Sequence, residues 1–368
     1  MKLVFFTHSV ASDWNHGNAH FLRGLLDALA RKGHPVTSAE PVAGWSLTNL
    51  VEDAGAAPVV RFAREFPRID VVNYHVDKDL PDRIREITAG ADAVVVHEWT
   101  DPAVVGLLAL ERIRRDDFVL LFHDTHHRAV SAPGAMAAFN LGPYDGVLAF
   151  GDSLREVYER RYGVQRAWTF HEAADTDRFR PLDLEQRDDV IWIGNWGDEE
   201  RSDELRTYWL DSAMAHPHLR FVAYGARYPE DALEELEAAG VDFRGWAPSL
   251  DVPELFARSR ITLHIPRRLY VEDLPGIPTI RVFEALACGI PLVSTPWKDT
   301  ESLFRDDDFA LVDSPAEMRR VIGRLYADPD VRAGQAERGL ETIRARHTCR
   351  HRADQLLEIL AGLGHDGS

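Results

Sequence analysis

Short apolar runs rich in β-branched and aromatic residues alternate with helical patterns along the whole chain, and this alternation limits the possible folds most strongly. Most runs are continuously apolar, which is typical of strands buried on both faces of a parallel sheet. The pattern predicts strand–helix–strand units in doubly wound α/β sheets. The predicted strands are residues 2–6, 69–74, 92–97, 118–123, 146–150, 189–193, 219–224, 260–265, 291–294 and 309–312.

The pattern restarts near residue 189, after a polar segment (176–189) that contains Pro181 and reads as a linker. We therefore expect two Rossmann-like domains, residues 1–180 and 181–349, and 368 residues are enough for two cores. A terminal helix predicted within 350–368 is expected to pack on the first domain. The first helix is predicted to end at Gly33, and its apolar face consists of Phe21, Leu22, Leu25, Leu26 and Leu29.

Composition excludes several classes of protein. The net charge of −18 argues against nucleic acid as a partner, because phosphate backbones need a basic face. No apolar run approaches the roughly 18 residues of a membrane helix, and the N-terminal run is too short for a signal peptide. Cys288 and Cys349 have no zinc or disulfide spacing. We expect a cytoplasmic protein without an integral membrane segment.

The stretch from 274 to 297 carries the best functional signal. Pro278 lies before a predicted helix that Gly289 closes, and the free N–H groups at such a helix start attract an anion such as a diphosphate. Glu284, about a turn and a half into the helix, can accept both hydroxyls of a ribose.

Arginines near this helix start suit phosphate oxygens. Arg281 lies within the helix, and Arg267 and Arg268 flank the preceding loop. Since the last two are adjacent, at most one is expected to point into the site.

The segment FEALACGIPLVST (283–295) resembles the C-terminal signature of GT-B fold glycosyltransferases of the group 1 type, close to their spore-maturation-protein-like branch. The resemblance implies that Glu284 holds the ribose of a nucleotide-sugar donor. It also implies that the loop Gly276, Ile277, Pro278 and Thr279 contacts the diphosphate.

Two upstream segments extend the resemblance. Residues 191–205 resemble the glycine-containing loop after the first strand of the donor domain, which implies that Gly194, Asn195 and Arg201 line the phosphate side. Residues 244–267 resemble the part that carries the base pocket. Arg201 lies among Asp198, Glu199, Glu200 and Asp203, so a surface ion pair is the alternative for it.

One position departs from the family pattern. Many retaining members have a second carboxylate eight residues before the ribose-binding glutamate, and this chain has Gly276 there. Glu272 or Asp273 is a possible substitute, so retention or inversion of configuration stays open.

The N-terminal half resembles the acceptor domain of the same family. A loop containing Trp14, His16, Gly17 and Asn18 follows the first strand, and Gly17 is expected to let the backbone approach the donor phosphate or the acceptor.

His97 and His123 end two further strands, followed by Glu98 and Asp124 respectively. Histidines at strand ends can contact the donor sugar or accept a proton from an acceptor hydroxyl. His97 and His123 are therefore catalytic candidates, with His16 as the alternative base of an inverting enzyme; hydrogen bonding within a loop is the competing interpretation.

We expect no metal and no cofactor. The group His123, His126 and His127 could suggest a metal site, but such clusters also arise in loops without metal. The run Asp306–Asp308 is predicted to be a solvated turn rather than a metal-binding motif.

These observations predict a metal-independent glycosyltransferase, of the hexosyltransferase type, that uses a UDP-sugar or similar nucleotide-sugar donor. Its acceptor could be a small molecule, a glycan or a protein. A nucleotide-sugar epimerase and a non-catalytic nucleotide-sugar-binding subunit are the two alternatives.

Overall fold

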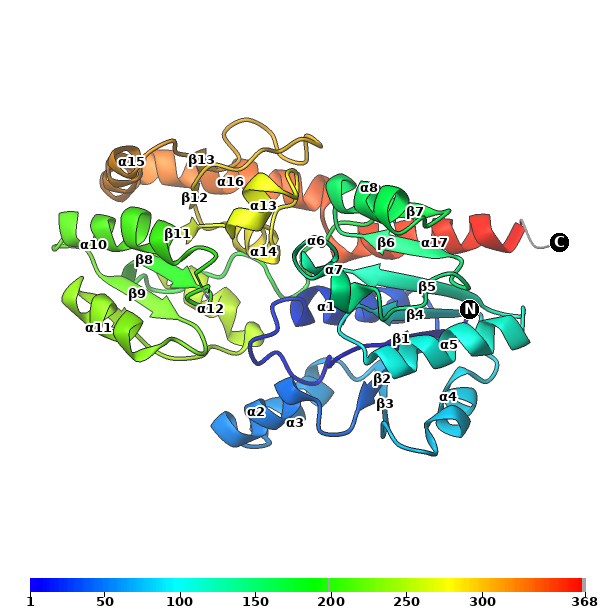
Figure 1. Ribbon diagram of the computed structural model, residues 1–368. Helices are drawn as coiled ribbons and strands as arrows, with labels where there is room; N and C mark the ends of the chain where they lie inside the picture. Colours follow the sequence, from blue (N-terminus) through cyan, green and yellow to red (C-terminus); the bar gives the residue numbers. More distant parts are fainter. Residues whose placement is uncertain (198, 366–368) are drawn as a thin grey trace. The chain divides into compact units, whose positions relative to one another are not determined.

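The chain folds into two compact units in the computed structural model, which describes residues 1–197 and 199–365 (Figure 1). The first unit comprises Met1–Glu172 together with the chain from Cys349 onward, and the second comprises Ala173–Thr348. The predicted linker, 176–189, therefore belongs to the second unit, where it leads into the first strand of that unit's sheet. Residues 366–368 of the predicted terminal segment, and Asp198, lie outside the described residues.

The first unit contains a parallel sheet of seven strands in the order β3-β2-β1-β4-β5-β6-β7. Its strands are β1 (Leu3–Phe6), β2 (Val36–Pro41), β3 (Ile69–Tyr74), β4 (Ala93–His97), β5 (Val119–Asp124), β6 (Gly146–Ala149) and β7 (Ala167–Thr169). Its helices are α1 (Ala19–Arg31), α2 (Trp45–Ala54), α3 (Ala57–Glu65), α4 (Leu80–Thr88), α5 (Pro102–Arg114), α6 (Arg128–Ser131), α7 (Pro133–Met136), α8 (Asp152–Arg161) and α17 (Cys349–His365).

The second unit contains a parallel sheet of six strands in the order β10-β9-β8-β11-β12-β13. Its strands are β8 (Asp188–Ile193), β9 (Phe221–Tyr224), β10 (Val241–Phe243), β11 (Ser259–His264), β12 (Leu292–Ser294) and β13 (Ala310–Leu311). Its helices are α9 (Ser202–Glu204), the π-helix η1 (Leu205–Leu210), α10 (Asp211–Ala215), α11 (Glu230–Ala238), the 3₁₀ turn η2 (Ser249–Asp251), α12 (Val252–Ala257), α13 (Arg268–Glu272), α14 (Ile280–Cys288), α15 (Pro315–Ala327) and α16 (Pro329–Arg346).

Each of the ten predicted strands has a counterpart in these sheets, and the fold class is confirmed. The sequence pattern missed β2, β7 and β10. β7 and β10 are three-residue strands at sheet edges, too short to show a pattern. β2 was missed because its sequence, VTSAEP, is half polar although the strand is buried.

The polar residues of β2 support the loop that follows β1. The carboxylate of Glu40, which is 1% exposed, accepts hydrogen bonds from Val10 N (2.7 Å) and from the Ser9 hydroxyl (3.0 Å). Burial raises the pKa of Glu40. A buried carboxyl is tolerated here because these donors satisfy its oxygen atoms.

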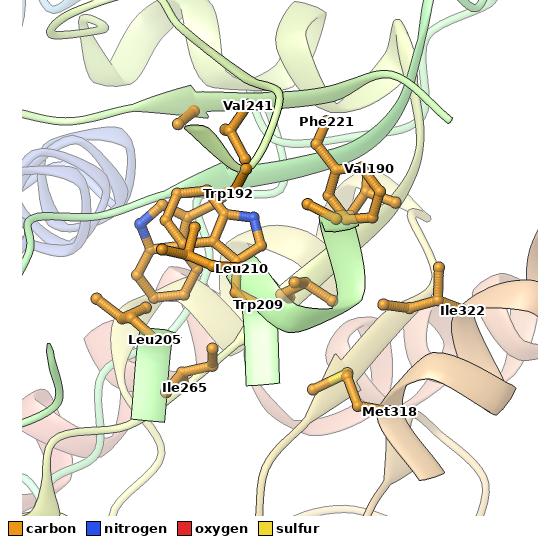
Figure 2. Close-up of a cluster of buried hydrophobic side chains, with 14 of the residues drawn as sticks. Val190, Trp192, Leu205, Trp209, Leu210, Phe221, Val241, Ile265, Met318 and Ile322 are labelled. Atoms are coloured by element: carbon orange, nitrogen blue, oxygen red, sulfur yellow. The ribbon is translucent and has the colours of Figure 1, made fainter. Parts of the chain in front are cut away.

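Two tryptophans anchor the core beside β8 in the second unit (Figure 2). Trp192 on β8 and Trp209 on η1 lie with ring centroids 5.5 Å apart, and both are at most 2% exposed. Figure 2 shows Leu205 and Leu210, also on η1, directed into the same cluster. This packing fixes the end of β8, from which the loop discussed below begins.

The terminal helix α17 belongs to the first unit. Gln355 donates to the carbonyl of Thr169 at the end of β7 (2.8 Å), and Arg352 Nε donates to the carbonyl of His171 (2.8 Å). Directly after α1, Lys32 forms an ion pair with Asp354 of α17 at 2.6 Å.

Helix α14 packs tightly against α16 at Gly339. A Cβ at this position would lie 2.7 Å from Leu286 Cδ2 and 2.9 Å from the carbonyl oxygen of Asp308. Gly334, on the same helix, has only the tip of the Arg338 side chain nearby, at 3.4 Å.

We expect Gly339→Ala to lower the free energy of unfolding of the second unit by about 1–3 kcal/mol, because the added methyl group overpacks a rigid contact. Gly334→Ala is the matched control on the same helix and should raise it by up to about 1 kcal/mol through helix propensity. Urea unfolding followed by tryptophan fluorescence measures both. Equal effects of the two variants would contradict the close packing of α14 on α16.

Candidate functional site

Both sheets reverse their strand order between their first and fourth strands. In the first unit the reversal lies between β1 and β4, and in the second it lies between β8 and β11. Ligands of open α/β sheets bind beyond the carboxyl ends of the strands at such a point. The loops after these four strands contain most of the candidate residues.

The loop after β8 wraps around the guanidinium group of Arg201. Arg201 donates to the backbone carbonyl (2.9 Å) and the side-chain oxygen (2.7 Å) of Asn195. It also donates to the carbonyl of Ile265, in the loop after β11, at 3.1 Å. Its hydrogen bonds thus join the two loops at the reversal point instead of forming the surface ion pair considered above.

Two glycines make room for this arginine. A Cβ on Gly194 would lie 2.9 Å from the Trp192 ring and 3.2 Å from Arg201 Nη2. Gly197 has a φ of +99°, and a Cβ there would collide with the Arg201 side chain. The loop therefore needs glycine at both positions, because the half-buried side chain of Arg201 occupies the space that the Cβ atoms would take.

Three guanidinium groups lie close enough to affect one another. Burial, and next the charge of Arg267, lower the pKa of Arg201 to about 10, and Arg281 acts in the same direction. Arg201 stays protonated at neutral pH. Positive charge concentrated in this way, in a protein of net charge −18, is suited to an anionic ligand.

Arg267 and Arg268 point to different partners. Arg267 donates to the Asn195 side chain (3.3 Å) and pairs with Glu200, so it belongs to the Arg201 cluster. Arg268 contacts Asp203 and Glu204 at 3.8 and 3.7 Å. The prediction that at most one of the two points into a ligand site stays a prediction.

The start of α14 is held in place by a histidine that sequence reasoning missed. One ring nitrogen of His264, the last residue of β11, lies 2.8 Å from the Ser294 hydroxyl, and the other lies 3.2 Å from the Thr279 hydroxyl. Burial, Arg201 and Arg281 lower the pKa of His264 to about 3, so its ring is neutral. Thr279 is the residue before α14, so His264 orients the helix N-terminus that was predicted to bind phosphate.

Glu284 lies on α14 with 2% of its surface exposed and forms an ion pair with Arg281, three residues earlier. Arg281 Nε is buried and has no hydrogen bond within residues 1–197 and 199–365. Glu284, which was predicted to bind the ribose, and Arg281, which was predicted to bind phosphate, are therefore paired with each other in this structure. A bound diphosphate would offer Arg281 oxygen atoms that compete for the same guanidinium group.

The loop before α14 has no space for a side chain at position 276. Gly276 has a φ of +90°, and a Cβ there would collide with the Thr300 hydroxyl. Ile277 and Pro278 are buried beside it. This explains physically why a carboxylate residue is absent from this position.

In the first unit, histidine rings form a row across the loops after β1, β4 and β5. His8 and His16 have ring centroids 5.7 Å apart, His16 and His97 6.2 Å, and His97 and His123 5.5 Å. His97 and His123 are register partners at the ends of β4 and β5. His8, which sequence reasoning missed, adds the fourth ring and stacks on Trp45 at 4.9 Å.

All four rings are neutral at neutral pH. Burial lowers the pKa of His97 to about 3 and that of His8 to about 4, and neighbouring charges act in the same direction. Burial also lowers the pKa values of His16 and His123 well below the usual range. A neutral imidazole can accept a proton from a hydroxyl group.

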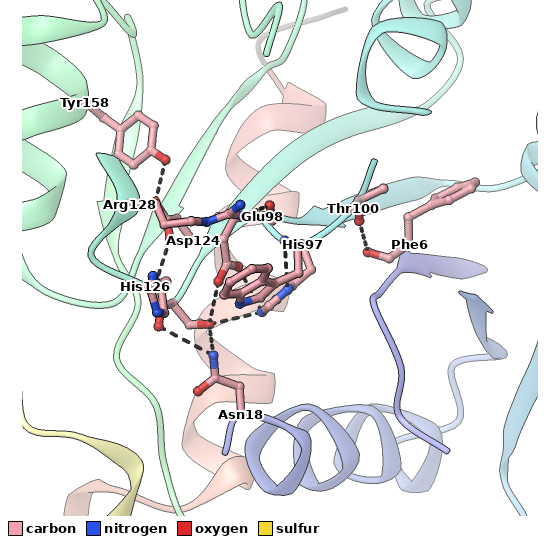
Figure 3. A network of polar contacts seen from close by, with 11 residues as sticks. Phe6, Asn18, His97, Glu98, Thr100, Asp124, His126, Arg128 and Tyr158 are labelled. Atoms are coloured by element: carbon pink, nitrogen blue, oxygen red, sulfur yellow. Dashed lines mark hydrogen bonds and ion pairs between the residues drawn. The ribbon is translucent and has the colours of Figure 1, made fainter. Parts of the chain in front are cut away.

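The ring of His97 is held on both sides (Figure 3). Trp99 N donates to Nδ1 at 3.5 Å, and Nε2 lies 3.0 Å from both the Thr125 hydroxyl and Glu98 Oε2. The side chain of Asn18 donates to the same Thr125 hydroxyl. Asn18 thus ties the start of α1 to the β5 loop.

Two carboxyl groups lie beneath this network. Burial raises the pKa of Glu98 to about 8 and, together with the charge of Glu98, that of Asp124 to about 8. Figure 3 shows the Tyr158 hydroxyl directed at Asp124, to which it donates at 2.5 Å. The side chains of Glu98, Asp124 and Tyr158 thus pack inside the unit, next to the ends of β4 and β5.

His16 and His123 differ in their surroundings. The ring of His123 lies edge-on to Phe21 and Phe170, at 6.0 and 5.6 Å, within the core. His16 lies in the loop after β1, and its Nε2 has no hydrogen bond in the part of the chain that the structure describes. In this loop Gly17 is exposed, and the left-handed residue is Asn15 (φ 47°).

Among the described residues, no group of three or more histidine, cysteine or acidic side chains is arranged to hold a metal ion. In the run Asp306–Asp308, the first two residues are exposed, whereas Asp308 is buried and accepts a hydrogen bond from Arg305 N at 2.8 Å. No helix within residues 1–197 and 199–365 has the length and apolarity to cross a membrane.

Residues 201–358, less than half of the chain, match the family model described as "Glycosyl transferase-like". No curated protein shows a significant match. Solved structures match over almost the whole chain. An α-glucosyltransferase in complex with UDP and a 13-mer DNA has a TM-score of 0.70 and 12% identity, with 98% of both chains covered.

The fold is that of the GT-B glycosyltransferases. The sucrose-phosphate synthase of Thermosynechococcus elongatus has a TM-score of 0.68 and 15% identity over 100% of both chains. Anabaena HepE in complex with UDP and glucose has a TM-score of 0.70 and 14% identity, covering 98% of this chain and 100% of that one.

Proposed function

We propose that this protein is a glycosyltransferase, of the hexosyltransferase type, that moves a sugar from a UDP-sugar donor to an acceptor. The observation that carries the proposal is the cluster of Arg201, Arg267 and Arg281 at the reversal point of the second sheet, with Glu284 on α14. The match of residues 201–358 to a glycosyl transferase-like family model supports it. So do structural neighbours described in complex with UDP.

In this proposal the second unit binds the donor. The N-terminus of α14 and the three arginines bind the diphosphate, and the loop from Gly276 to Thr279 together with Gly194 and Asn195 shapes the backbone around it. Glu284 accepts the hydroxyls of the ribose when the phosphate engages Arg281.

Transfer breaks the bond between the anomeric carbon and the diphosphate, whose oxygen develops negative charge. Once Arg281 has exchanged Glu284 for the phosphate, the guanidinium groups and the helix N–H groups stabilise that charge, so we propose that no metal is required.

We assign the acceptor side to the first unit. His16 is the preferred proton acceptor: its Nε2 and that of His123 both lack a hydrogen bond among the described residues, but His16 lies in the loop after β1, whereas the ring of His123 packs against Phe21 and Phe170. His97 is held by Thr125 and His123 by phenylalanine rings, so we assign both to orienting this region.

The acceptor could be a small molecule, a glycan or a protein. A cytoplasmic location and kinship with the spore-maturation-protein-like branch are parts of the same proposal.

A turnover assay tests the function. The protein is incubated with a panel of nucleotide sugars, with and without acceptor extracts and with EDTA, while free nucleoside diphosphate and donor isomers are followed. We expect nucleoside diphosphate release that depends on the acceptor and persists in EDTA. Isomer formation without acceptor would indicate an epimerase, and donor binding without turnover would indicate a binding subunit; either result would overturn the proposal.

Glu284→Gln should weaken UDP binding about tenfold or more, because a charge-assisted hydrogen bond to the ribose is lost. Isothermal titration with UDP measures the change. Glu337→Gln, at an exposed position of α16, is the control and should bind UDP like the wild type. Unchanged affinity in Glu284→Gln would refute the ribose assignment.

His16→Asn should lower kcat about 10²- to 10⁴-fold and leave UDP affinity unchanged, because it removes a base and not a donor ligand. His75→Asn, an exposed histidine of the same unit, is the control. Steady-state kinetics with the acceptor found in the panel assay measures kcat, and circular dichroism checks that both variants fold. A wild-type kcat in His16→Asn would exclude this histidine as the base.

A further inference from the structure

The space into which a side chain at position 276 would project is filled from another loop. A Cβ on Gly276 would collide with the Thr300 hydroxyl and would lie 3.4 Å from Glu301 Oε1. Thr300 and Glu301 belong to the segment between β12 and β13, 24 residues or more further along the chain. The loop that leads into α14 has no side chain at position 276. The carboxylate of Glu301 and the hydroxyl of Thr300 nevertheless lie beside it.

The segment that holds these two residues is firmly anchored. The carboxylate of Asp299 accepts hydrogen bonds from Leu303 N (3.0 Å) and Phe304 N (2.9 Å), which closes a turn around Thr300 and Glu301. From α16, Arg346 donates to the carbonyl of Ser302 at 3.2 Å. The ring of His347 lies 2.8 Å from the carbonyl of Leu303.

The backbone within this turn is strained. Ser302, directly after Glu301, has a φ of 54°, in the left-handed region that non-glycine residues rarely adopt. Such a conformation costs free energy and persists only when surrounding contacts impose it, and residues of this kind gather at ligand sites. The anchored turn therefore fixes the backbone of Glu301 beside the Gly276 loop.

We propose that Glu301, assisted by Thr300, binds hydroxyl groups of the donor's sugar and so determines which sugar is accepted. The inference rests on the function proposed above. If the diphosphate lies at the start of α14 and the ribose at Glu284, the sugar continues from the terminal phosphate along the Gly276 loop. A carboxylate accepts two hydrogen bonds from neighbouring hydroxyls, and a threonine hydroxyl can donate or accept.

Glu272 and Asp273, the substitutes that the sequence alone suggested, are placed differently. Both are exposed at the end of α13, whereas Glu301 is half-buried and packed toward Gly276. A half-buried carboxylate in a fixed turn loses less freedom when it binds a ligand than an exposed one does.

The test compares Glu301→Gln with the wild type, using the nucleotide sugar that the wild type turns over, its analogues deoxygenated at single ring carbons, and UDP alone. We expect kcat/KM of Glu301→Gln to fall about 10- to 100-fold for the full sugar, as for loss of a hydrogen bond to a charged group. UDP affinity should stay within about twofold of wild type, because the proposal places Glu301 against the sugar and not against the nucleotide. Removing the sugar hydroxyl that Glu301 binds should lower kcat/KM of the wild type but hardly change kcat/KM of Glu301→Gln.

Controls separate the possible failures. Glu337→Gln should show wild-type discrimination between the full and the deoxygenated sugars. Thr300→Val, which keeps the shape of the side chain, should weaken turnover of the full sugar less than Glu301→Gln does. If the wild type neither binds UDP nor turns over a nucleotide sugar, the proposed function fails. If the wild type is active and Glu301→Gln discriminates between the sugars as the wild type does, the role of Glu301 is overturned.

Discussion

Parallel pairing of the first strand with the fourth, β1 with β4 and β8 with β11, is the constraint on which the rest of each unit depends. Parallel neighbours must be joined by crossovers, and the order of strands reverses where two series of crossovers diverge. At that point two loops leave the sheet edge without a helix packed between them. In the second unit these loops supply Asn195, Arg201 and Arg267. In the first, the loop after β1 supplies His16, and His97 is the last residue of β4.

The second unit uses this geometry to keep positive charge together without neutralising it entirely. Arg201 donates mainly to carbonyl and amide oxygens, which hold the guanidinium group but leave its charge available to a ligand. Burial, and next the repulsion from Arg267, lower the pKa of Arg201 and so raise the free-energy cost of leaving the group without an anion. Glycines at 194 and 197 are required because the arginine side chain occupies the space that their Cβ atoms would need.

Much of the fold could be predicted from the sequence because strands buried in a parallel sheet appear in the sequence as continuous apolar runs. β2 was missed because its buried polar residues Ser38 and Glu40 form hydrogen bonds with Thr7 and Ser9 of the β1 loop, a long-range compensation that no local pattern reveals. Among the candidate site residues, Glu284 and Arg281 were proposed from their places on one predicted helix and, for Glu284, from the family resemblance. His264, His8 and Glu301 were missed because their partners, Thr279, Trp45 and Gly276, come from other loops.

The sequence by itself determined that the chain forms two parallel α/β sheets, where most of their strands run, and which helix follows the glycine-containing loop of residues 274–279. These properties depend on residues close to one another in the chain. Only the tertiary structure decided which arginine of the pair 267 and 268 joins Arg201, that the four histidines are neutral, and that Glu301 stands against Gly276. Burial and the meeting of loops distant in sequence set these properties, because a pKa or a contact depends on what surrounds a side chain in space.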